Sequence, residues 1–189
     1  MLVKSHIVDQ NQIIERCKKG NQQAQAYLFR QYRSVLFGVI MRYIKDPFTA
    51  EDILADSFVH IFKKIAQFKG KGSFEGWMKR IAVTQALMYL RANQKIFFTE
   101  EQSVFEEEVD AHALDQLEVE DIMECIRQLP EGYRAVFNLY VIEGYKHREI
   151  AELLDISIHT SKSQLIMARK KLVERLQAIN YPGLQNYSA

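Results

Sequence analysis

The sequence predicts an all-α protein in which two small helical domains are joined by a flexible acidic linker. Only three prolines and eight glycines interrupt 189 residues, and long stretches place apolar side chains three and four positions apart, as on one helix face. The net charge of +1 is a cancellation. Residues 96–126 hold eleven acidic and no Lys or Arg side chains, whereas residues 1–95 hold sixteen basic against seven acidic and residues 127–189 hold nine against six. Two basic segments therefore flank an acidic one.

Composition also argues against several classes of protein. No apolar run approaches the roughly 20 residues that cross a bilayer, and the first residues lack a signal-peptide pattern, so we expect a cytoplasmic protein with no direct membrane insertion. Cys17 and Cys125 have no CxxC or His partners, and the five histidines are scattered. Since no nucleophile motif or phosphate-binding glycine loop appears either, we expect no enzyme, no catalytic residue, no metal and no cofactor.

The first two helices of the amino-terminal domain have clear ends. A short helix over residues 9–19 is expected to end at Gly20, a residue suited to helix termination. Asn21 can then cap a long second helix. The side chains that we expect this helix to turn inward are Leu28, Tyr32, Leu36, Ile40 and Tyr43.

The third and fourth helices follow from equally local signals. Asp46 supplies an N-cap oxygen for the third helix, and Pro47 a fixed first-turn backbone. A glycine-containing loop over residues 68–73 precedes a fourth helix over about 74–92. The apolar stripe of the third helix consists of Ile53, Leu54, Phe58, Ile61, Phe62 and Ile65.

The middle of the chain sets the domain bounds. Between residues 95 and 115 the periodicity weakens and the charge becomes one-signed, which predicts a connector. Helical spacing then resumes from Leu114, stops at Pro130 and continues to Gly144, which predicts two further helices. We therefore predict domains at 9–94 and 116–178 with an acidic linker at 95–115. An ordinary solvated linker explains the charge pattern as well as a polyanion partner that binds the basic flanks.

A helix-turn-helix is predicted near the carboxyl end. A short helix over residues 146–154 is followed by the tight turn Asp155–Ser157, and Ser157 can cap a long helix from Ile158. At 100 degrees per residue the inward side chains of that helix are Ser161, Leu165, Ala168, Leu172 and Leu176. The side chains expected to face outward, or to flank that face, are His159, Thr160, Lys162, Ser163, Gln164 and Lys170.

This outward face suits a DNA recognition helix. Polar side chains near the amino end of such a helix reach base edges in the major groove, and basic ones further along hold phosphates. A plain antiparallel helical hairpin with one solvated face would show the same pattern.

A second group of candidate residues lies in the loop after the third helix and in the helix that follows. Cations there can hold a phosphate backbone, while aromatic faces can accept unstacked bases, which is the chemistry of single-strand binding. The alternative is that Phe74, Trp77 and Ile81 are simply core. The candidates for DNA binding are Lys69, Lys71, Phe74, Trp77, Lys79, Arg80 and Arg91.

Motifs in both halves resemble one known family, the bacterial RNA polymerase sigma factors of the extracytoplasmic function (ECF) subgroup. The resemblance covers about residues 10–178. The motifs similar to region 2 of the family are Ala50–Ile53, Asp56–Phe58, Phe74, Trp77–Ala82 and Leu90–Arg91. Those similar to region 4 are Leu129–Pro130, Arg134–Phe137, Glu143–Tyr145, Glu149–Leu154 and Thr160–Ser163.

The resemblance implies a division of labour. The first domain would bind the clamp helices of the polymerase beta-prime subunit and open the minus-10 promoter element. The second would read the minus-35 element and touch the beta flap. An anti-sigma factor is also implied. The polymerase-binding residues that the resemblance implies are Glu51, Asp52, Asp56 and Phe58.

Some positions depart from the pattern of the family. Ser161 stands at an inward site where the family usually has Val, and His159 stands where it usually has Gly. In region 2, Thr84 and Met88 replace the frequent Asn and Asp, and Asp56 replaces a frequent Gln. Base preference is therefore left open by the sequence.

Two rival classes stay open at this point. A helix-turn-helix regulator would bind operator DNA without polymerase, whereas a helical adaptor that binds only proteins would tolerate charge reversal at Lys162 and Lys170.

Overall fold

The computed structural model describes residues 10–93 and 119–178, which form helices, turns and loops and no strand. This confirms the predicted all-α class. The chain divides into two compact units, residues 1–86 and 87–189. The division falls inside a helix, and the predicted bounds 9–94 and 116–178 stay predictions. The predicted linker at 95–115 lies outside the described residues.

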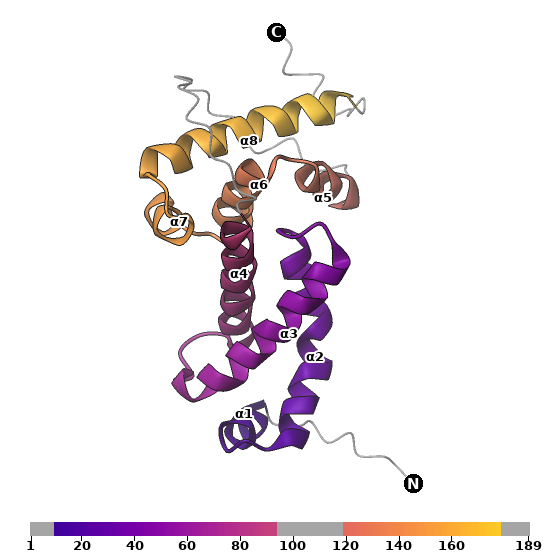
Figure 1. The fold of residues 1–189 in the computed structure, drawn as a ribbon, viewed down its shortest axis with the longest axis vertical. Coiled ribbons are helices and arrows are strands. Elements are labelled where there is room, and N and C mark those ends of the chain that lie inside the picture. Colours follow the sequence, from indigo (N-terminus) through magenta and orange to yellow (C-terminus); the bar gives the residue numbers. More distant parts are fainter. Residues whose placement is uncertain (1–9, 94–118, 179–189) are drawn as a thin grey trace. The chain divides into compact units, whose positions relative to one another are not determined.

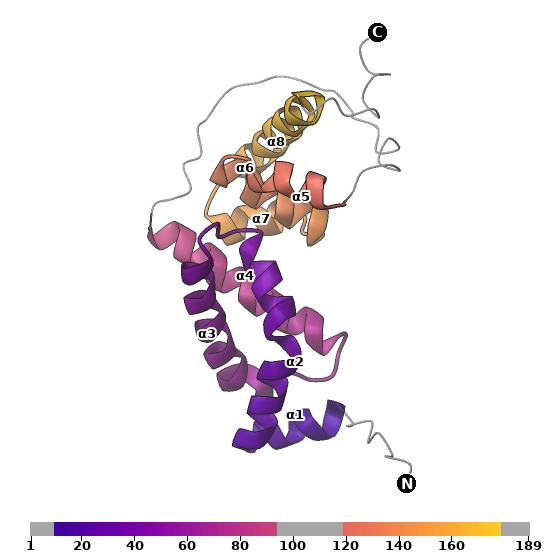
Figure 2. The ribbon, with the colours of Figure 1, turned by 90° about the vertical axis from the view of Figure 1, so that its right-hand side faces the viewer.

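The first unit is built from helices that follow one another along the chain (Figure 1). Their bounds are α1 Gln10–Lys18, α2 Gln22–Met41, α3 Pro47–Lys64, a 3-10 turn Ile65–Gln67 and α4 Phe74–Ala92, of which residues 74–86 fall in this unit. Helix α2 packs against both α1 and α3, and Figure 2 shows α2 and α3 side by side. These bounds match the predicted helices closely.

The predicted caps of the first unit are confirmed. The Asn21 side chain accepts a hydrogen bond from the Ala24 N–H at 2.9 Å, and Asp46 Oδ2 accepts one from the Thr49 N–H at 2.8 Å. Each cap satisfies one of the amide groups that a helix start leaves without a partner. The core of this unit is made by the apolar faces of its helices, and its buried side chains include Leu28, Leu36, Ile40, Tyr43, Ile53, Leu54, Phe58, Ile61 and Ile65.

The second unit is organised around one long helix. Its elements are α5 Val119–Arg127, α6 Glu131–Phe137, a π-helical turn Asn138–Ile142, α7 His147–Leu154 and α8 Ile158–Ala178. Helix α8 contacts α5, α6 and α7. Helix ends at Pro130 and Gly144 were predicted, whereas the π-helical turn was not, because a single extra residue per turn leaves no clear periodic signal. Leu114 lies outside the described residues.

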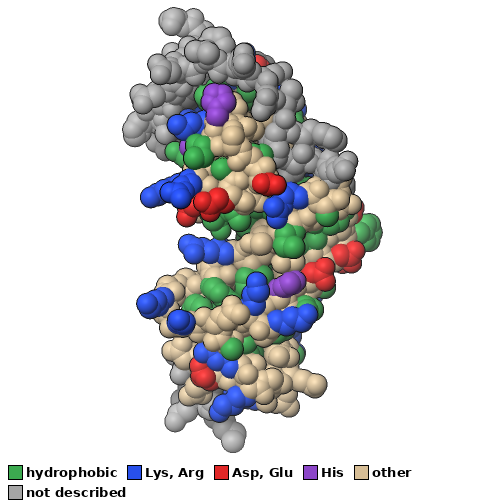
Figure 3. Space-filling view, turned by 60° about the vertical axis from the view of Figure 1, so that its left-hand side comes forward, with side chains coloured by type: hydrophobic (Ala, Val, Ile, Leu, Met, Phe, Trp, Pro, Cys, Tyr) green, Lys and Arg blue, Asp and Glu red, His purple; other side chains and the backbone are tan. Residues whose placement is uncertain are grey.

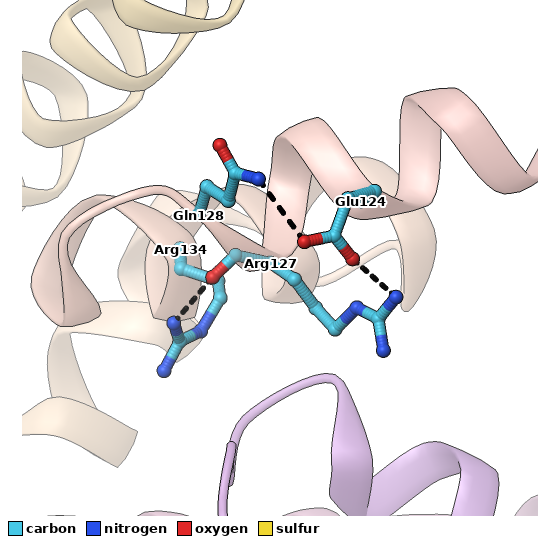
Figure 4. Close-up of polar contacts among 4 residues, drawn as sticks. All are labelled: Glu124, Arg127, Gln128 and Arg134. Atoms are coloured by element: carbon cyan, nitrogen blue, oxygen red, sulfur yellow. Dashed lines mark hydrogen bonds and ion pairs between the residues drawn. The ribbon is translucent and has the colours of Figure 1, made fainter.

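A polar network joins the end of α5 to α6 (Figure 4). Arg134 is 1% exposed, and its Nη1 donates to the carbonyl oxygens of Arg127 at 2.8 Å and Leu129 at 3.3 Å. Glu124 forms an ion pair with Arg127 and accepts a hydrogen bond from Gln128 at 3.1 Å. Arg134 therefore holds the Arg127 carbonyl at the end of α5 and the Leu129 carbonyl just after it, groups that a helix end leaves without a helical partner.

Candidate nucleic-acid interface

The helix-turn-helix is formed by α7, a three-residue turn and α8. Asp155 adopts a left-handed backbone with φ 56°, which reverses the chain after α7. Ser157 Oγ then accepts a hydrogen bond from the Thr160 N–H at 2.9 Å and lies 2.8 Å from the Thr160 hydroxyl. The predicted cap of the recognition helix is thus confirmed.

The exposed face of α8 carries most of the predicted DNA-contacting side chains. His159, Lys162 and Lys170 are exposed, and Ser163 is half-buried with its hydroxyl donating to the Thr160 carbonyl at 3.0 Å. Arg169 is partly exposed next to Lys170 and was not predicted. The sequence signal that could have identified Arg169 is the run of three cations at residues 169–171.

The predicted orientation of two residues of α8 is wrong. Thr160 is 7% exposed and Gln164 is 2% exposed, so neither presents its side chain to solvent. Helix α8 contacts α5, α6 and α7 rather than a single helix, and its buried arc therefore includes Thr160 and Gln164 beside the predicted stripe. Thr160 instead completes the Ser157 cap.

The loop before α4 presents cations on a backbone that glycine makes accessible. Lys69 and Lys71 are exposed, and Gly70 and Gly72 have φ values of +73° and +81°. Residues that have a Cβ atom rarely adopt such backbone angles. No atom lies within 4 Å of a Cβ added at either glycine, so the loop backbone is open to a ligand that approaches closely.

An aromatic cluster supports this loop. The rings of Phe74 and Trp77 stack with centroids 5.6 Å apart, and Phe68 packs against both at 5.1 and 5.6 Å. Tyr32 adds an edge contact to Phe74 at 6.2 Å. Phe74 is buried and is therefore a support of the loop, whereas Trp77 is half-buried and keeps part of its side chain accessible.

The cations of α4 are accessible to different degrees. Arg80 and Arg91 are exposed, and Lys79 forms an ion pair with Glu75 at 2.7 Å. Figure 3 shows Lys and Arg side chains, in blue, projecting from the surface, with Asp and Glu side chains, in red, among them. Exposed cations such as Arg80 and Arg91 favour a polyanionic ligand.

The acidic surface predicted on α3 is present, with one correction. Glu51, Asp52 and Asp56 are exposed, but Phe58 is 3% exposed and packs against the Phe29 ring at 4.7 Å. Phe58 is therefore a core residue and is wrongly placed on a contact surface. The exposed aromatic side chain of this helix is Phe48, at 79%. The sequence signal for Phe48 is an aromatic residue directly after the Asp46–Pro47 helix start and outside the apolar stripe of the helix.

Within residues 10–93 and 119–178, no three His, Cys, Asp or Glu side chains gather as metal ligands would. In the same ranges, no helix combines the length and hydropathy needed to cross a membrane. Burial raises the pKa of both Cys17 and Cys125, and both thiols are buried.

Comparison with known families places both units. Residues 28–96 match sigma-70 region 2, and residues 119–172 match sigma-70 region 4. The chain is 26% identical over 181 residues to the RNA polymerase sigma-H factor of Pseudomonas aeruginosa, covering 89% of this chain and 94% of that protein. It is 27% identical over 183 residues to the ECF RNA polymerase sigma-E factor of Haemophilus influenzae, covering 88% and 95%.

A solved structure is also similar. It is the sigma factor RpoE in complex with the anti-sigma factor NepR from Bartonella quintana, with 20% identity and a TM-score of 0.49. The similarity covers 80% of this chain and 96% of that one.

A helix-turn-helix and a cationic, aromatic-backed loop in one short helical chain define a DNA-binding transcription factor. The chain belongs to the sigma-70 family of RNA polymerase sigma factors, in the extracytoplasmic function group. Sigma factors are not enzymes. They bind core RNA polymerase and direct it to promoter DNA for specific initiation.

Proposed function

We propose that the two units of this sigma factor contact the promoter through different sets of residues. The second unit reads the minus-35 element as duplex DNA, and the first opens and holds the minus-10 element. The observation that supports this division is the contrast between a capped helix with exposed cations and a cationic loop backed by stacked aromatic rings.

The minus-35 contacts are proposed for the exposed side chains at the amino end of α8. His159, Lys162 and Ser163 are the candidates for base edges and nearby phosphates, and Lys170 for a phosphate further along. Thr160 and Gln164 are left out because they are buried. They would act by fixing the helix that carries the others.

The minus-10 contacts are proposed for the loop and α4. Lys69 and Lys71 would hold the backbone of the opened strand, with the half-buried Trp77 offering part of its ring to an unstacked base. The exposed Arg80 and Arg91 would provide further cations for the DNA backbone, while the buried Phe74 ring supports the loop. Lys79 is held by Glu75 and contributes less free charge.

The polymerase-binding surface is proposed for α3. Glu51, Asp52 and Asp56 present carboxylates, and Phe48 provides an exposed aromatic anchor of the kind that dominates protein interfaces. The beta-prime clamp helices would be the partner of this surface, and the beta flap the partner of the second unit. We expect Phe48→Ala to lower the affinity for core polymerase at least tenfold, since a buried aromatic anchor is worth about 2 kcal/mol or more.

Two further expectations come from the family. We place the protein in the cytoplasm, where core polymerase acts, and we expect an anti-sigma factor to cover its polymerase-binding surfaces. Co-purification of partners with the full chain from cells tests the second expectation, and fractionation of the same cells tests the first.

One experiment separates this proposal from a conventional helix-turn-helix regulator. Promoter fragments are titrated in a mobility-shift assay with the full chain alone and with core polymerase. The proposal predicts strong binding with core only. Equal affinity without core would favour an operator-binding regulator, and unchanged binding by Lys162→Glu with Lys170→Glu would favour a protein-binding adaptor.

A further inference from the structure

The imidazole of His147 bridges the two helices of the helix-turn-helix. Its Nδ1 lies 2.9 Å from Ser161 Oγ, a hydrogen-bond distance between the first residue of α7 and the first full turn of α8. The ring also stacks on Tyr140, with centroids 4.5 Å apart and planes 25° apart. One side chain thus joins α7, α8 and the π-helical turn.

The π-helical turn helps to set up this bridge. It carries one residue more per turn than an α-helix, so the side chains that follow are rotated relative to those of α6. Its hydrogen bonds include the Glu143 N–H to the Asn138 carbonyl at 2.9 Å, which a regular α-helix would not contain. Tyr140 is 37% exposed within this turn and covers one face of the His147 ring.

Ser161 lies on the buried side of α8, close in sequence to side chains that face solvent. It is fully buried, yet it adjoins the exposed Lys162 and lies two residues from His159. A buried hydroxyl must keep a hydrogen-bond partner, and His147 supplies one from the neighbouring helix. The bond therefore ties the inner side of the recognition helix to α7 at the level of its DNA-facing residues.

We propose that His147 is a positioning residue for the recognition helix, which acts through its hydrogen bond to Ser161 and its stacking on Tyr140 to fix how α8 presents Lys162 and Ser163 to the minus-35 element. This inference rests on the proposed function of the second unit. His147 itself reads no base. Loss of the His147 side chain changes the angle and the rigidity of α8. It therefore lowers discrimination between promoters more than it lowers the stability of the fold.

The charges around His147 favour the neutral ring. Burial lowers the pKa of His147, and the cations Lys162 and Arg169 on α8 lower it further. A neutral imidazole has one donor and one acceptor nitrogen, so Nδ1 can pair with the Ser161 hydroxyl. Tyr140 is the other titratable group in contact with the ring.

The test measures discrimination by the holoenzyme. The full chain is assembled with core polymerase, and its Kd is measured for a promoter mapped by transcription and for the same promoter with a scrambled minus-35 element. The ratio of the two Kd values reports reading by α8 alone. Thermal unfolding of each variant is measured in parallel to detect a purely structural effect.

Four variants and one control sharpen this test. We expect His147→Ala and Ser161→Ala each to reduce the ratio roughly tenfold, about the discrimination carried by one good base contact. His147→Asn places an amide atom near the position of Nδ1 and should keep the ratio within about twofold. The double variant, His147→Ala with Ser161→Ala, should reduce the ratio no more than either single alanine variant does. His60→Ala, which removes an imidazole from α3, should behave as wild type.

Each outcome decides between the alternatives. Unchanged ratios in both alanine variants, or an equal loss of affinity for both promoters, would overturn the positioning role. If wild-type holoenzyme itself does not distinguish the two promoters, the proposed minus-35 function fails, and the positioning role fails with it. Should His147→Ala not fold, Ser161→Ala and His147→Asn still give the answer.

Discussion

Arg134 is a charged residue with a structural role inside the second unit. Burial lowers the pKa of its guanidinium while the Glu131 carboxylate opposes that shift, and the group donates to the carbonyls of Arg127, the last residue of α5, and of Leu129. A cation near a helix carboxyl end also complements the helix dipole. The residue thus links α5 to α6 by polar contacts inside the unit.

We expect Arg134→Ala to lower the free energy of unfolding by about 2–4 kcal/mol, because it leaves buried carbonyls without donors and opens a cavity. Denaturant unfolding of the full chain measures this. The control is Arg148→Ala, an exposed arginine in a loose ion pair with Glu152 at 3.6 Å, where the change should stay within about 0.5 kcal/mol. A similar small loss for both variants would contradict the structural role of Arg134.

Phe48 and Phe58 form a matched pair on one helix with opposite expected roles. Phe58 is buried against Phe29, so Phe58→Ala should cost about 3–5 kcal/mol of stability. Phe48 is 79% exposed, so Phe48→Ala should leave stability within about 0.5 kcal/mol while weakening core-polymerase binding. Unfolding and pull-down with core polymerase measure the two effects. The assignment of these residues is wrong if their effects are exchanged.

His147 should make the second unit sensitive to acid. Its pKa in the folded chain lies below the ordinary value of 6.5, so the unfolded chain binds more protons as the pH falls. The stability that this neutral ring contributes is therefore fully present above pH 6.5 and is lost as the pH falls toward its lowered folded pKa. We expect His147→Asn to flatten the pH dependence of the unfolding free energy between about pH 7 and pH 5. Parallel curves for wild type and variant would exclude this linkage.

At the scale of helices, the sequence was most informative about helix starts. Asn21, Asp46 and Ser157 were all predicted as N-caps, and each accepts the expected backbone hydrogen bond. Such bonds are made within three residues, so local sequence contains the whole interaction. Helix bounds in the first unit follow for the same reason.

Orientation within α8 was harder to predict because it depends on distant partners. The spacing of Ser161 and Leu165 identified one buried stripe correctly, but nothing local revealed that further helices also cover Thr160 and Gln164. Phe58 shows the same limit in reverse, since its place in the apolar stripe was a better guide than its place in a family motif. The hydrogen bond between His147 and Ser161 joins residues that are 14 apart in the sequence, so no local pattern predicts it.

The cap of the recognition helix offers a test at this scale. Ser157→Ala removes the acceptor for the Thr160 N–H and should destabilise the second unit by about 1 kcal/mol. Ser157→Asp keeps a capping oxygen and should restore stability. Circular dichroism during thermal unfolding of the full chain gives both values. Equal stability of wild type and Ser157→Ala would mean that the cap contributes nothing.

At the scale of the whole chain, the two units differ in the surface that we propose for DNA. The second offers a stiff helix with exposed polar and cationic groups, whereas the first offers a glycine-containing loop over stacked rings. Duplex reading suits the former and contact with opened strands suits the latter. This asymmetry, together with both sigma-70 region matches, is what an ordinary repressor lacks.

The most direct test of this account is transcription from a genomic DNA library by core polymerase with and without the full chain, with start sites mapped. We predict start sites that appear only with the protein and share one element near minus 10 and another near minus 35. Lys69→Glu with Lys71→Glu should block opening, and Lys162→Glu with Lys170→Glu should remove dependence on the upstream element. The absence of protein-dependent start sites would contradict the central claim.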